Sequence, residues 1–294
     1  MELVNFSESE EKINRYKGSE KKKTLIYNGK RYLVKFPDPL REKNKNISYI
    51  NNAYSEYLGS KIFESVGFNT QKVILGYYKI EDKEKIVCAC EDFTDEENTL
   101  YEFENLTISG DVDKKIDTEI SDILEIIKKN EAIIDTKNTI KEFWKIFIVD
   151  SLIGNTDRHN GNWGFLENQK DGKLKFAPIY DCGSCLNPLL EDAEIIKYLE
   201  NETELKNVAL NTYSCLKENN KKINYYHYIN SLKNEECNKA LIEIFPKINI
   251  EKINKIIDEI DCISQERKEF YKKIIKIKYE NILEKSYKKI SKRR

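Results

Sequence analysis

The chain has 294 residues, with 50 Lys and Arg against 51 Asp and Glu, so its formal net charge is −1. This balance argues against a protein whose main work is to grip nucleic acid or an acidic membrane through a general basic field. Seven cysteines, an odd number in a long chain, fit reduced thiols better than a disulfide framework. No apolar run approaches the roughly 20 residues that span a bilayer, and residues 1–5 lack the pattern of a signal peptide. We therefore expect a cytoplasmic globular protein, with secretion by a signal-less route left open.

The first third of the sequence has mainly the pattern of β-strands. Residues 24–36 predict a β-hairpin, because two short apolar runs are joined by Asn28-Gly29, the dipeptide that favours a type I′ turn. Residues 71–93 predict a second hairpin around a charged turn. Between the two, apolar residues recur at helical spacing over 54–66, and Gly67 follows where a left-handed residue would end a helix.

From about residue 115 the hydrophobic period becomes helical. Residues 116–127 and 140–152 predict two helices, and 163–180 predict a hairpin around Asp171-Gly172. The remainder, 189–294, is expected to be mainly helical.

Together these patterns predict an α+β fold of two lobes, without internal repeats or low-complexity linkers. Residues 1–95 would form a small β-rich N-lobe with one helix. Residues 96–294 would form a larger, mainly helical C-lobe interrupted by one hairpin.

The densest polar cluster, residues 154–162, lies between a buried-looking helix and a strand, where functional loops tend to lie. The hairpin that begins at Asn162 returns Asp181 close to it. An amide and a carboxylate side by side are hard-oxygen ligands of the kind that hold Mg²⁺ together with a nucleotide's phosphates. Asp157, five residues before Asn162, can face the same space.

Phosphoryl transfer needs this arrangement: a metal to neutralise phosphate charge and a carboxylate that orients or accepts the hydroxyl proton. Lys35 lies on the second strand of the first hairpin, and Glu56 lies within the helix that follows. A Lys–Glu pair of this kind holds the phosphate-binding lysine of a kinase in place. The sequence therefore predicts a kinase fold with ATP and Mg²⁺ as cofactors.

At these residues the sequence resembles the HipA-like serine/threonine kinase family, and within it the compact CtkA-type members with a HipA C-terminal-like kinase core. The matching segments follow the family's order, and the block 157–162 is the most specific of them. They are residues 32–37, 55–59, 90–93, 155–162 and 180–184.

The resemblance implies a role for each matching residue. Lys35 would contact the ATP phosphates, and Glu56 would pair with it. Asp157 would be the catalytic aspartate, with Asn162 and Asp181 as metal ligands.

Two further binding segments follow from the resemblance. The backbone around Cys88, Ala89 and Cys90 would face adenine as a hinge, and Gly18 and Ser19 would belong to the loop that covers the phosphates. That loop departs from the family pattern, because Gly18 is its one glycine. Longer members carry, directly before this glycine, a serine whose autophosphorylation turns the kinase off. Here Lys17 occupies that position, and Ser19 is the nearest substitute.

The resemblance also implies a protein substrate with a Ser or Thr acceptor and an ability to autophosphorylate. A toxin-like role and an antitoxin partner are left open, because longer members have a subdomain before the kinase core and this sequence has only a short stretch there.

Two other functions remain alternatives. The block 155–163 is also similar to the catalytic loop of type II phosphatidylinositol 4-kinases, so the acceptor could be a phosphatidylinositol or another small molecule. The glycine-poor loop leaves room for a nucleotide-binding pseudokinase or interaction module.

Several residues have both a structural and a functional interpretation. Cys88, Cys90, Cys182 and Cys185 could form a four-thiolate zinc site or be buried apolar cysteines.

Arg158 lies within the polar cluster 154–162, which we call the catalytic block because of the family resemblance. It could pair with an acidic or phosphorylated group or form a structural ion pair. His159 is expected to support backbone. The Lys-rich end, 285–294, could contact nucleic acid or anionic lipid, but a solvated helix face is the commoner arrangement.

Overall fold

The structure is a computed structural model that describes residues 1–13, 22–37, 51–81, 83–106 and 117–293. Two of the predicted site residues, Gly18 and Ser19, lie outside the described residues.

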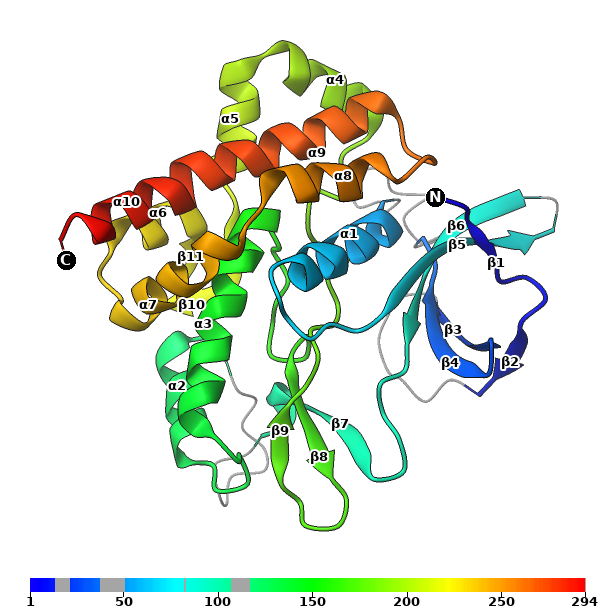
Figure 1. Cartoon of the computed structure of the whole chain (residues 1–294), viewed down its shortest axis with the longest axis horizontal. Helices are drawn as coiled ribbons and strands as arrows, with labels where there is room; N and C mark the ends of the chain where they lie inside the picture. The colour runs from blue at the N-terminus through cyan, green and yellow to red at the C-terminus, as the bar shows by residue number, and fades with distance from the viewer. Residues whose placement is uncertain (14–21, 38–50, 82, 107–116, 294) are drawn as a thin grey trace.

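A six-stranded sheet forms the N-terminal part of the chain, in the order β1-β5-β6-β4-β3-β2 (Figure 1). Its strands are β1 (Val4–Asn5), β2 (Glu10–Lys12), β3 (Lys22–Tyr27), β4 (Lys30–Lys35), β5 (Val73–Ile80) and β6 (Lys83–Glu91). Asn28 and Gly29, with φ of 48° and 73°, turn β3 into β4 as a type I′ turn requires. Both predicted hairpins are confirmed, whereas β1 and β2 were not predicted.

Helix α1 (Asn52–Ser65) is buried on more than one side. It contacts β5 and β6 of the sheet and also α8 of the C-terminal part, and Figure 1 shows it between these layers. The predicted helix is confirmed, and Gly67 follows it with φ of 94°. Glu56 lies on this helix and is 1% exposed, so its carboxylate must find its partners inside the protein.

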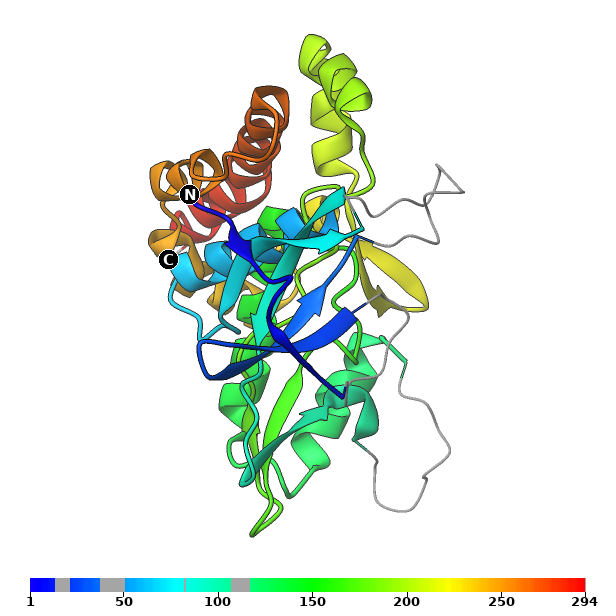
Figure 2. The ribbon, with the colours of Figure 1, turned by 90° about the vertical axis from the view of Figure 1, so that its right-hand side faces the viewer.

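The rest of the chain is mainly helical, as predicted, and Figures 1 and 2 show its helices gathered beside the sheet. The helices are α2 (Ile120–Lys129), α3 (Thr136–Ile153), α4 (Asp192–Glu200), α5 (Glu202–Leu210), α6 (Tyr225–Ser231), α7 (Glu235–Ile244), α8 (Ile250–Asp258), α9 (Gln265–Lys278) and α10 (Lys285–Ser291), with a π-helical turn Tyr279–Glu284 before α10. Short 3₁₀ turns occupy Phe103–Asn105 and Phe245–Lys247. The α+β fold class is confirmed, while the lobe boundary between residues 95 and 96 stays a prediction.

A three-stranded sheet lies at the end of the molecule away from α4 and α5 (Figure 1). Its strands are β7 (Asn98–Glu102), β8 (Gly164–Asn168) and β9 (Leu174–Phe176). The predicted strand up to residue 180 was therefore too long. After β9 the chain crosses to the N-terminal part, where Ile179 exchanges backbone hydrogen bonds of 2.8 Å with Asn69 and Gln71. This crossing places Asp181 next to the six-stranded sheet.

A hairpin of β10 (Tyr213–Glu218) and β11 (Lys221–Asn224) interrupts the C-terminal helices. The region was expected to be helical, and this hairpin was missed. Asn219 and Asn220 make its turn, with φ of 54° and 62°. An Asn-Asn dipeptide between polar strands was the available signal, because Asn tolerates the left-handed backbone that such turns need.

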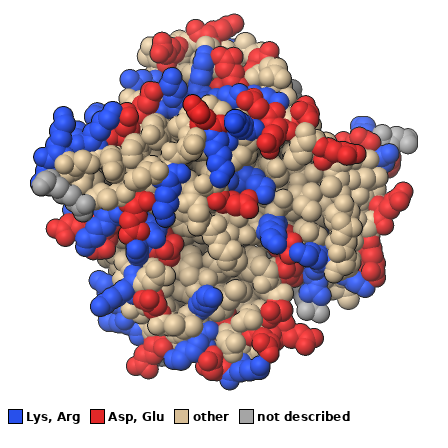
Figure 3. Space-filling model, in the orientation of Figure 1, with Lys and Arg blue, Asp and Glu red and all other residues tan. Residues whose placement is uncertain are grey.

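Charged side chains of both signs interleave over the face seen in Figure 3. Near the C-terminus, Lys288 pairs with Glu284 at 2.8 Å and Lys285 lies over the ring of Tyr226. Part of the basic charge of this end is therefore engaged within the chain. Among the described residues, no helix combines the length and the apolar character needed to cross a bilayer.

Helix α1 packs tightly at Gly59 against the segment after Asp181. A Cβ atom there would lie 2.6 Å from Cys182 Cβ and 3.0 Å from Cys185 Sγ. Only glycine allows this approach, so we expect Gly59→Ala to destabilise the protein by about 1–3 kcal/mol through overpacking. Alanine would otherwise favour a helix by about 1 kcal/mol. Thermal unfolding measures the change, with Lys61→Ala on α1 as the control. A higher melting temperature for Gly59→Ala would contradict the close packing.

Candidate active site

Three of the predicted site residues meet around the amine of Lys35, the last residue of β4. Its Nζ donates to Glu56 Oε2 at 2.8 Å and to Asp181 Oδ1 at 2.9 Å. The other oxygen of Glu56, Oε1, accepts the backbone N–H of Cys182 at 2.9 Å. Glu56 therefore fixes both the lysine and the backbone that follows Asp181. Asp181 keeps 39% of its side chain exposed, so one side of the carboxylate faces open space.

The carboxylate of Asp181 is held in its ionised form. Burial works to raise its pKa, but the Lys35 ammonium outweighs burial, and the pKa lies below its ordinary value. The residue also has a positive φ of 55°. A left-handed backbone at a residue other than glycine carries strain, and such strain often occurs at functional sites. Here the surrounding hydrogen bonds hold it in place.

The guanidinium of Arg158 joins the two polar segments of the site. Its Nη1 donates to the backbone carbonyl oxygens of Asn162 at 2.9 Å and Asp181 at 3.2 Å, and it also donates to that of Tyr180. Two carbonyls bound by one nitrogen must be close neighbours. The return of Asp181 to the side of Asn162, predicted from the hairpin, is thus explained by Arg158.

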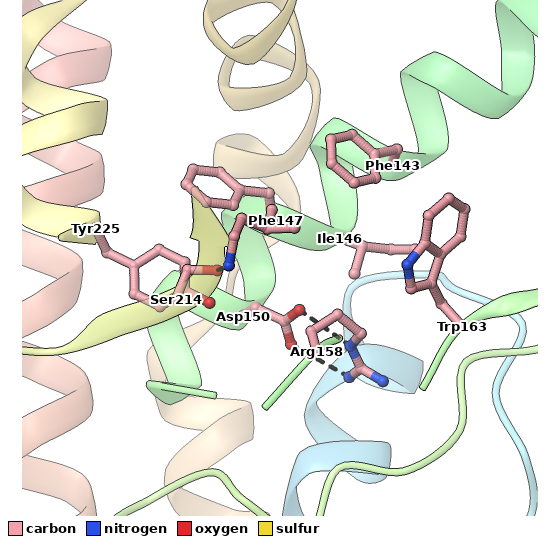
Figure 4. Close-up of a pocket in the computed structure, with 9 residues that line it drawn as sticks. Phe143, Ile146, Phe147, Asp150, Arg158, Trp163, Ser214 and Tyr225 are labelled. Carbon is pink, nitrogen blue, oxygen red and sulfur yellow. Dashed lines mark hydrogen bonds and ion pairs between the residues drawn. The ribbon is translucent and has the colours of Figure 1, made fainter. Parts of the chain in front are cut away.

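The other side of this guanidinium is anchored to helix α3. Arg158 Nε and Nη2 donate to the two carboxylate oxygens of Asp150 at 3.1 and 3.2 Å (Figure 4). Both side chains are almost fully buried. Burial alone would lower the pKa of Arg158, but Asp150 outweighs it and raises that pKa well above its ordinary value. Of the two interpretations of Arg158, the structural ion pair is the one present.

Asp157 lies at the exposed edge of the catalytic block, three residues after Gly154 ends α3 with φ of 66°. Its backbone N–H donates to Asn155 Oδ1 at 3.1 Å, and its carbonyl accepts Asn162 Nδ2 at 2.7 Å. Partial burial raises the pKa of Asp157, and the nearby carboxylate of Asp181 raises it further. Asn162, which binds the carbonyl of Asp157, is held beside Asp181 by Arg158, so Asp157 belongs to the same part of the site.

The predicted metal ligands have the chemistry that Mg²⁺ needs. Asp181 offers carboxylate oxygens, and Asn162 uses its amide nitrogen on Asp157, which leaves its amide oxygen as the group to offer a cation. Hard oxygen donors with room for water are the usual Mg²⁺ ligands. The residues present therefore fit the ion.

The four cysteines do not favour a zinc site. All four are free and buried. Burial raises the pKa of the Cys182 thiol to about 12, as is usual for a buried structural cysteine. Within the described parts of the chain, no group of three or more His, Cys, Asp or Glu side chains is placed to hold a metal ion.

The hinge prediction needs correction. Cys88, Ala89 and Cys90 lie inside β6, are 0% exposed, and are paired in register with β4 on one side and β5 on the other. Their backbone groups are engaged in the sheet and cannot face a base. The chain leaves the sheet after Glu91, so residues 91–93 are the connecting segment. The family-like block 90–93 was the signal for this placement.

His159 supports backbone, as expected, because its Nδ1 accepts the N–H of Gly161 at 3.0 Å. Behind the catalytic block lies a cavity of about 10 Å³, lined by side chains that include Asp150, Arg158, Trp163 and Tyr225 (Figure 4). It has room for about one water molecule, so it is a packing feature and not the nucleotide site.

Comparison with known proteins assigns the chain to a family. The family model of the HipA-like C-terminal domain matches residues 15–267. The chain belongs to this family. It is 42% identical to the serine/threonine-protein kinase CtkA of Helicobacter pylori over 252 aligned residues. The aligned region covers 84% of this chain and 75% of that protein.

Solved structures agree with the family assignment. The crystal structure of a Helicobacter pylori proinflammatory kinase CtkA matches with a TM-score of 0.87 and 35% identity over 99% of both chains. HipA of Shewanella oneidensis, solved with HipB and its operator DNA, matches with a TM-score of 0.59 and 13% identity over 93% of this chain and 66% of that one, and shares the fold. The family resemblance predicted from the sequence is thus confirmed.

Sequence reasoning missed one central residue of this HipA-like chain, Asp150. It is the only charged residue in the stretch 146–153 of α3, where the seven other residues are buried with it. A charge in such a stretch is rarely tolerated without a partner. That isolation was the signal that could have identified it.

The Arg158–Asp150 pair should matter strongly for folding. Replacing Arg158 by leucine leaves the Asp150 carboxylate buried without its cation, so we expect a loss of about 3–5 kcal/mol in the free energy of unfolding. Chemical denaturation measures it. The matched control is Lys170→Leu, which removes the exposed Lys170–Glu97 pair and should leave stability unchanged. Equal stability of the Arg158→Leu variant and the wild type would contradict the anchoring role.

Proposed function

We propose that this chain transfers the γ-phosphoryl group of ATP to a serine or threonine hydroxyl of a protein. The observation that carries the proposal is the convergence of Lys35, Glu56 and Asp181 at 2.8 and 2.9 Å, with the block that carries Asp157 held beside them by Arg158. The homology to a serine/threonine-protein kinase supports the same reaction class.

Lys35 binds the phosphates of the nucleotide. Its ammonium is held by Glu56 from inside the protein, so little conformational entropy remains to be lost when phosphates bind. Asp181 shares the ammonium, which places the metal ligand and the phosphate-binding group side by side. Glu56 acts through Lys35 and the backbone of Cys182 as a positioning residue.

Asp157 orients the acceptor hydroxyl and accepts its proton. The residue is exposed, so a protein substrate can reach it. Burial raises its pKa above that of an ordinary aspartate, which makes it a better proton acceptor. Activity should therefore fall as the pH drops through this raised pKa.

Asn162 and Asp181 would hold Mg²⁺, which neutralises phosphate charge when bound. Residues 91–93, where the chain leaves β6, would provide the backbone that faces adenine. Gly18 and Ser19 remain the predicted covering loop. ATP use follows from the reaction class, and the Mg²⁺ ligands are part of this proposal.

Finer features of the predicted function are part of the proposal as well. Autophosphorylation is expected, with Ser19 as a candidate acceptor. A toxin-like role and an antitoxin partner rest on the family resemblance, whereas the expected cytoplasmic location rests on the cysteine usage of the sequence. Direct nucleic acid binding is not expected, because charges of both signs interleave on the surface seen in Figure 3.

The base assignment predicts the behaviour of Asp157→Asn. This change keeps the side-chain size but removes the proton acceptor, so we expect transfer to fall about 10²- to 10⁴-fold, the range of general-base contributions. The measurement is label transfer from γ-labelled ATP with Mg²⁺ to lysate proteins and to the chain itself, followed by phosphoamino acid analysis. Asp171→Asn, in the exposed turn between β8 and β9, is the matched control.

Three results would contradict the proposal. Undiminished transfer by Asp157→Asn would refute the base assignment. Label on lipid vesicles and not on Ser or Thr would favour the lipid-kinase alternative. Nucleotide binding without any transfer by the wild type would favour a pseudokinase.

A further inference from the structure

Lys278, the last residue of α9, is a buried amine without a partner. The residue is 1% exposed, and its Nζ has no hydrogen bond or ion pair within the described residues. Buried charged groups are nearly always paired, because an unpaired one costs folding stability. Burial lowers the pKa of Lys278 to about 8, so the ammonium is still present at neutral pH.

The amine lies against the start of the catalytic block. The first atom that a Cβ at Gly154 would meet is Lys278 Nζ, in severe overlap. Gly154 is the left-handed residue that ends α3, and residues 155–162 follow directly. The last carbonyl groups of a helix carry partial negative charge, and a cation near them is stabilising.

The same region connects to the segment that carries Asp181. The carbonyl of Ile153, at the end of α3, accepts the N–H of Leu186 at 2.9 Å. Cys185, next to Leu186, lies near enough to Lys278 to affect its pKa. The amine of Lys278 thus lies close both to the start of the catalytic block and to the segment that follows Asp181.

We propose that Lys278 is a positioning residue whose ammonium, at the C-terminal end of α3, holds residues 155–157 in the conformation that presents the Asp157 carboxylate. This role rests on the function proposed above. Lys278 does not contact substrate; it acts on Asp157 through the helix end and the backbone of the block.

Other charged groups around Lys278 are accounted for. The thiol of Cys185 has its pKa raised well above the ordinary value by burial and stays neutral. Asp150, on α3, is neutralised by Arg158. Tyr271, about two turns before Lys278 on α9, accepts a hydrogen bond from Arg267, and Thr212 carries no charge. The ammonium of Lys278 is therefore the group that should titrate here near pH 8.

The proposal predicts opposite effects on stability and activity. A lysine with a lowered pKa in the folded state destabilises the protein below that pKa, and the penalty fades as the pH rises from about 8 toward the ordinary lysine value. Lys278→Met, which is similar in length and uncharged, should therefore raise the melting temperature at pH 7. If the charge is retained for function, activity should fall in the same variant.

The experiment compares wild type, Lys278→Met and Lys268→Met. Lys268 is a buried lysine on the same helix, but its Nζ donates to the carbonyl of Asp258 at 2.9 Å, so it is the matched control. Three readouts are taken: melting temperature, kcat and KM for ATP between pH 6.5 and 9.5, and amide hydrogen exchange of residues 150–162 without nucleotide.

We expect Lys278→Met to melt higher, to lose about tenfold in kcat, the size of a buried helix-terminus charge effect, and to keep its KM for ATP. The amides of residues 155–162 should exchange faster in this variant. The change in kcat near pH 8 seen in the wild type should be absent from it. Lys268→Met should melt lower and keep the wild-type profile.

An unchanged pH profile and unchanged exchange in Lys278→Met would overturn the proposal. If Lys278→Met does not fold, the wild type alone tests the proposal. Its amide exchange rates at residues 155–157, corrected for intrinsic rates, should rise as the pH passes through 8. Exchange rates that do not change with pH would overturn the proposal. Hydrogen exchange can be measured without enzymatic activity. A wild type that transfers no phosphate would therefore refute the proposed function, and the exchange rates would still decide the role of Lys278.

Discussion

The site depends above all on one buried guanidinium. Arg158 donates to Asp150 on α3, to backbone carbonyls at Asn162, Tyr180 and Asp181, and to the sulfur of Cys182. A buried arginine must satisfy its donors, because each one left unpaired is costly. Since these acceptors come from a helix and two separate segments, the three cannot move apart without breaking the network.

The network continues into the six-stranded sheet. Cys182, bound through its sulfur by Arg158, gives its backbone N–H to Glu56, and Glu56 binds Lys35. A continuous path of hydrogen bonds therefore runs from α3 through the segment after Asp181 to α1 and β4. Lys35 and the block that carries Asp157 are thus aligned by buried contacts before any ligand arrives. Such preorganisation is how enzymes lower the entropic cost of catalysis.

Local signals explain what the sequence could predict. The turn at Asn28-Gly29, the period of α1 and the polar block 154–162 each depend on neighbouring residues, so Lys35, Glu56 and Asp157 could be assigned to elements and their convergence inferred. The hinge was misplaced for the opposite reason. The residue at which β6 leaves the sheet depends on how far its partners β4 and β5 extend. The residue pattern of β6 alone does not predict how far they extend.

Buried polar residues were the hardest to interpret. Asp150 acquires its role from Arg158, which lies beyond the end of α3. Lys278 acquires its role only through its contact with Gly154, more than a hundred residues earlier in the chain. Both stand out afterwards by the same physical criterion, a charge where solvent is excluded. One of them is paired, and the other is not.

The most direct test of the central claim is calorimetric titration of ATP into the purified chain, with Mg²⁺ and with a chelator. If Lys35 and Asp181 together form a metal-assisted phosphate site, ATP should bind at least tenfold more tightly with Mg²⁺, about 1.4 kcal/mol. Asp181→Asn should remove this difference. ATP affinity that is independent of Mg²⁺ in the wild type, or no binding at all, would contradict the site as described.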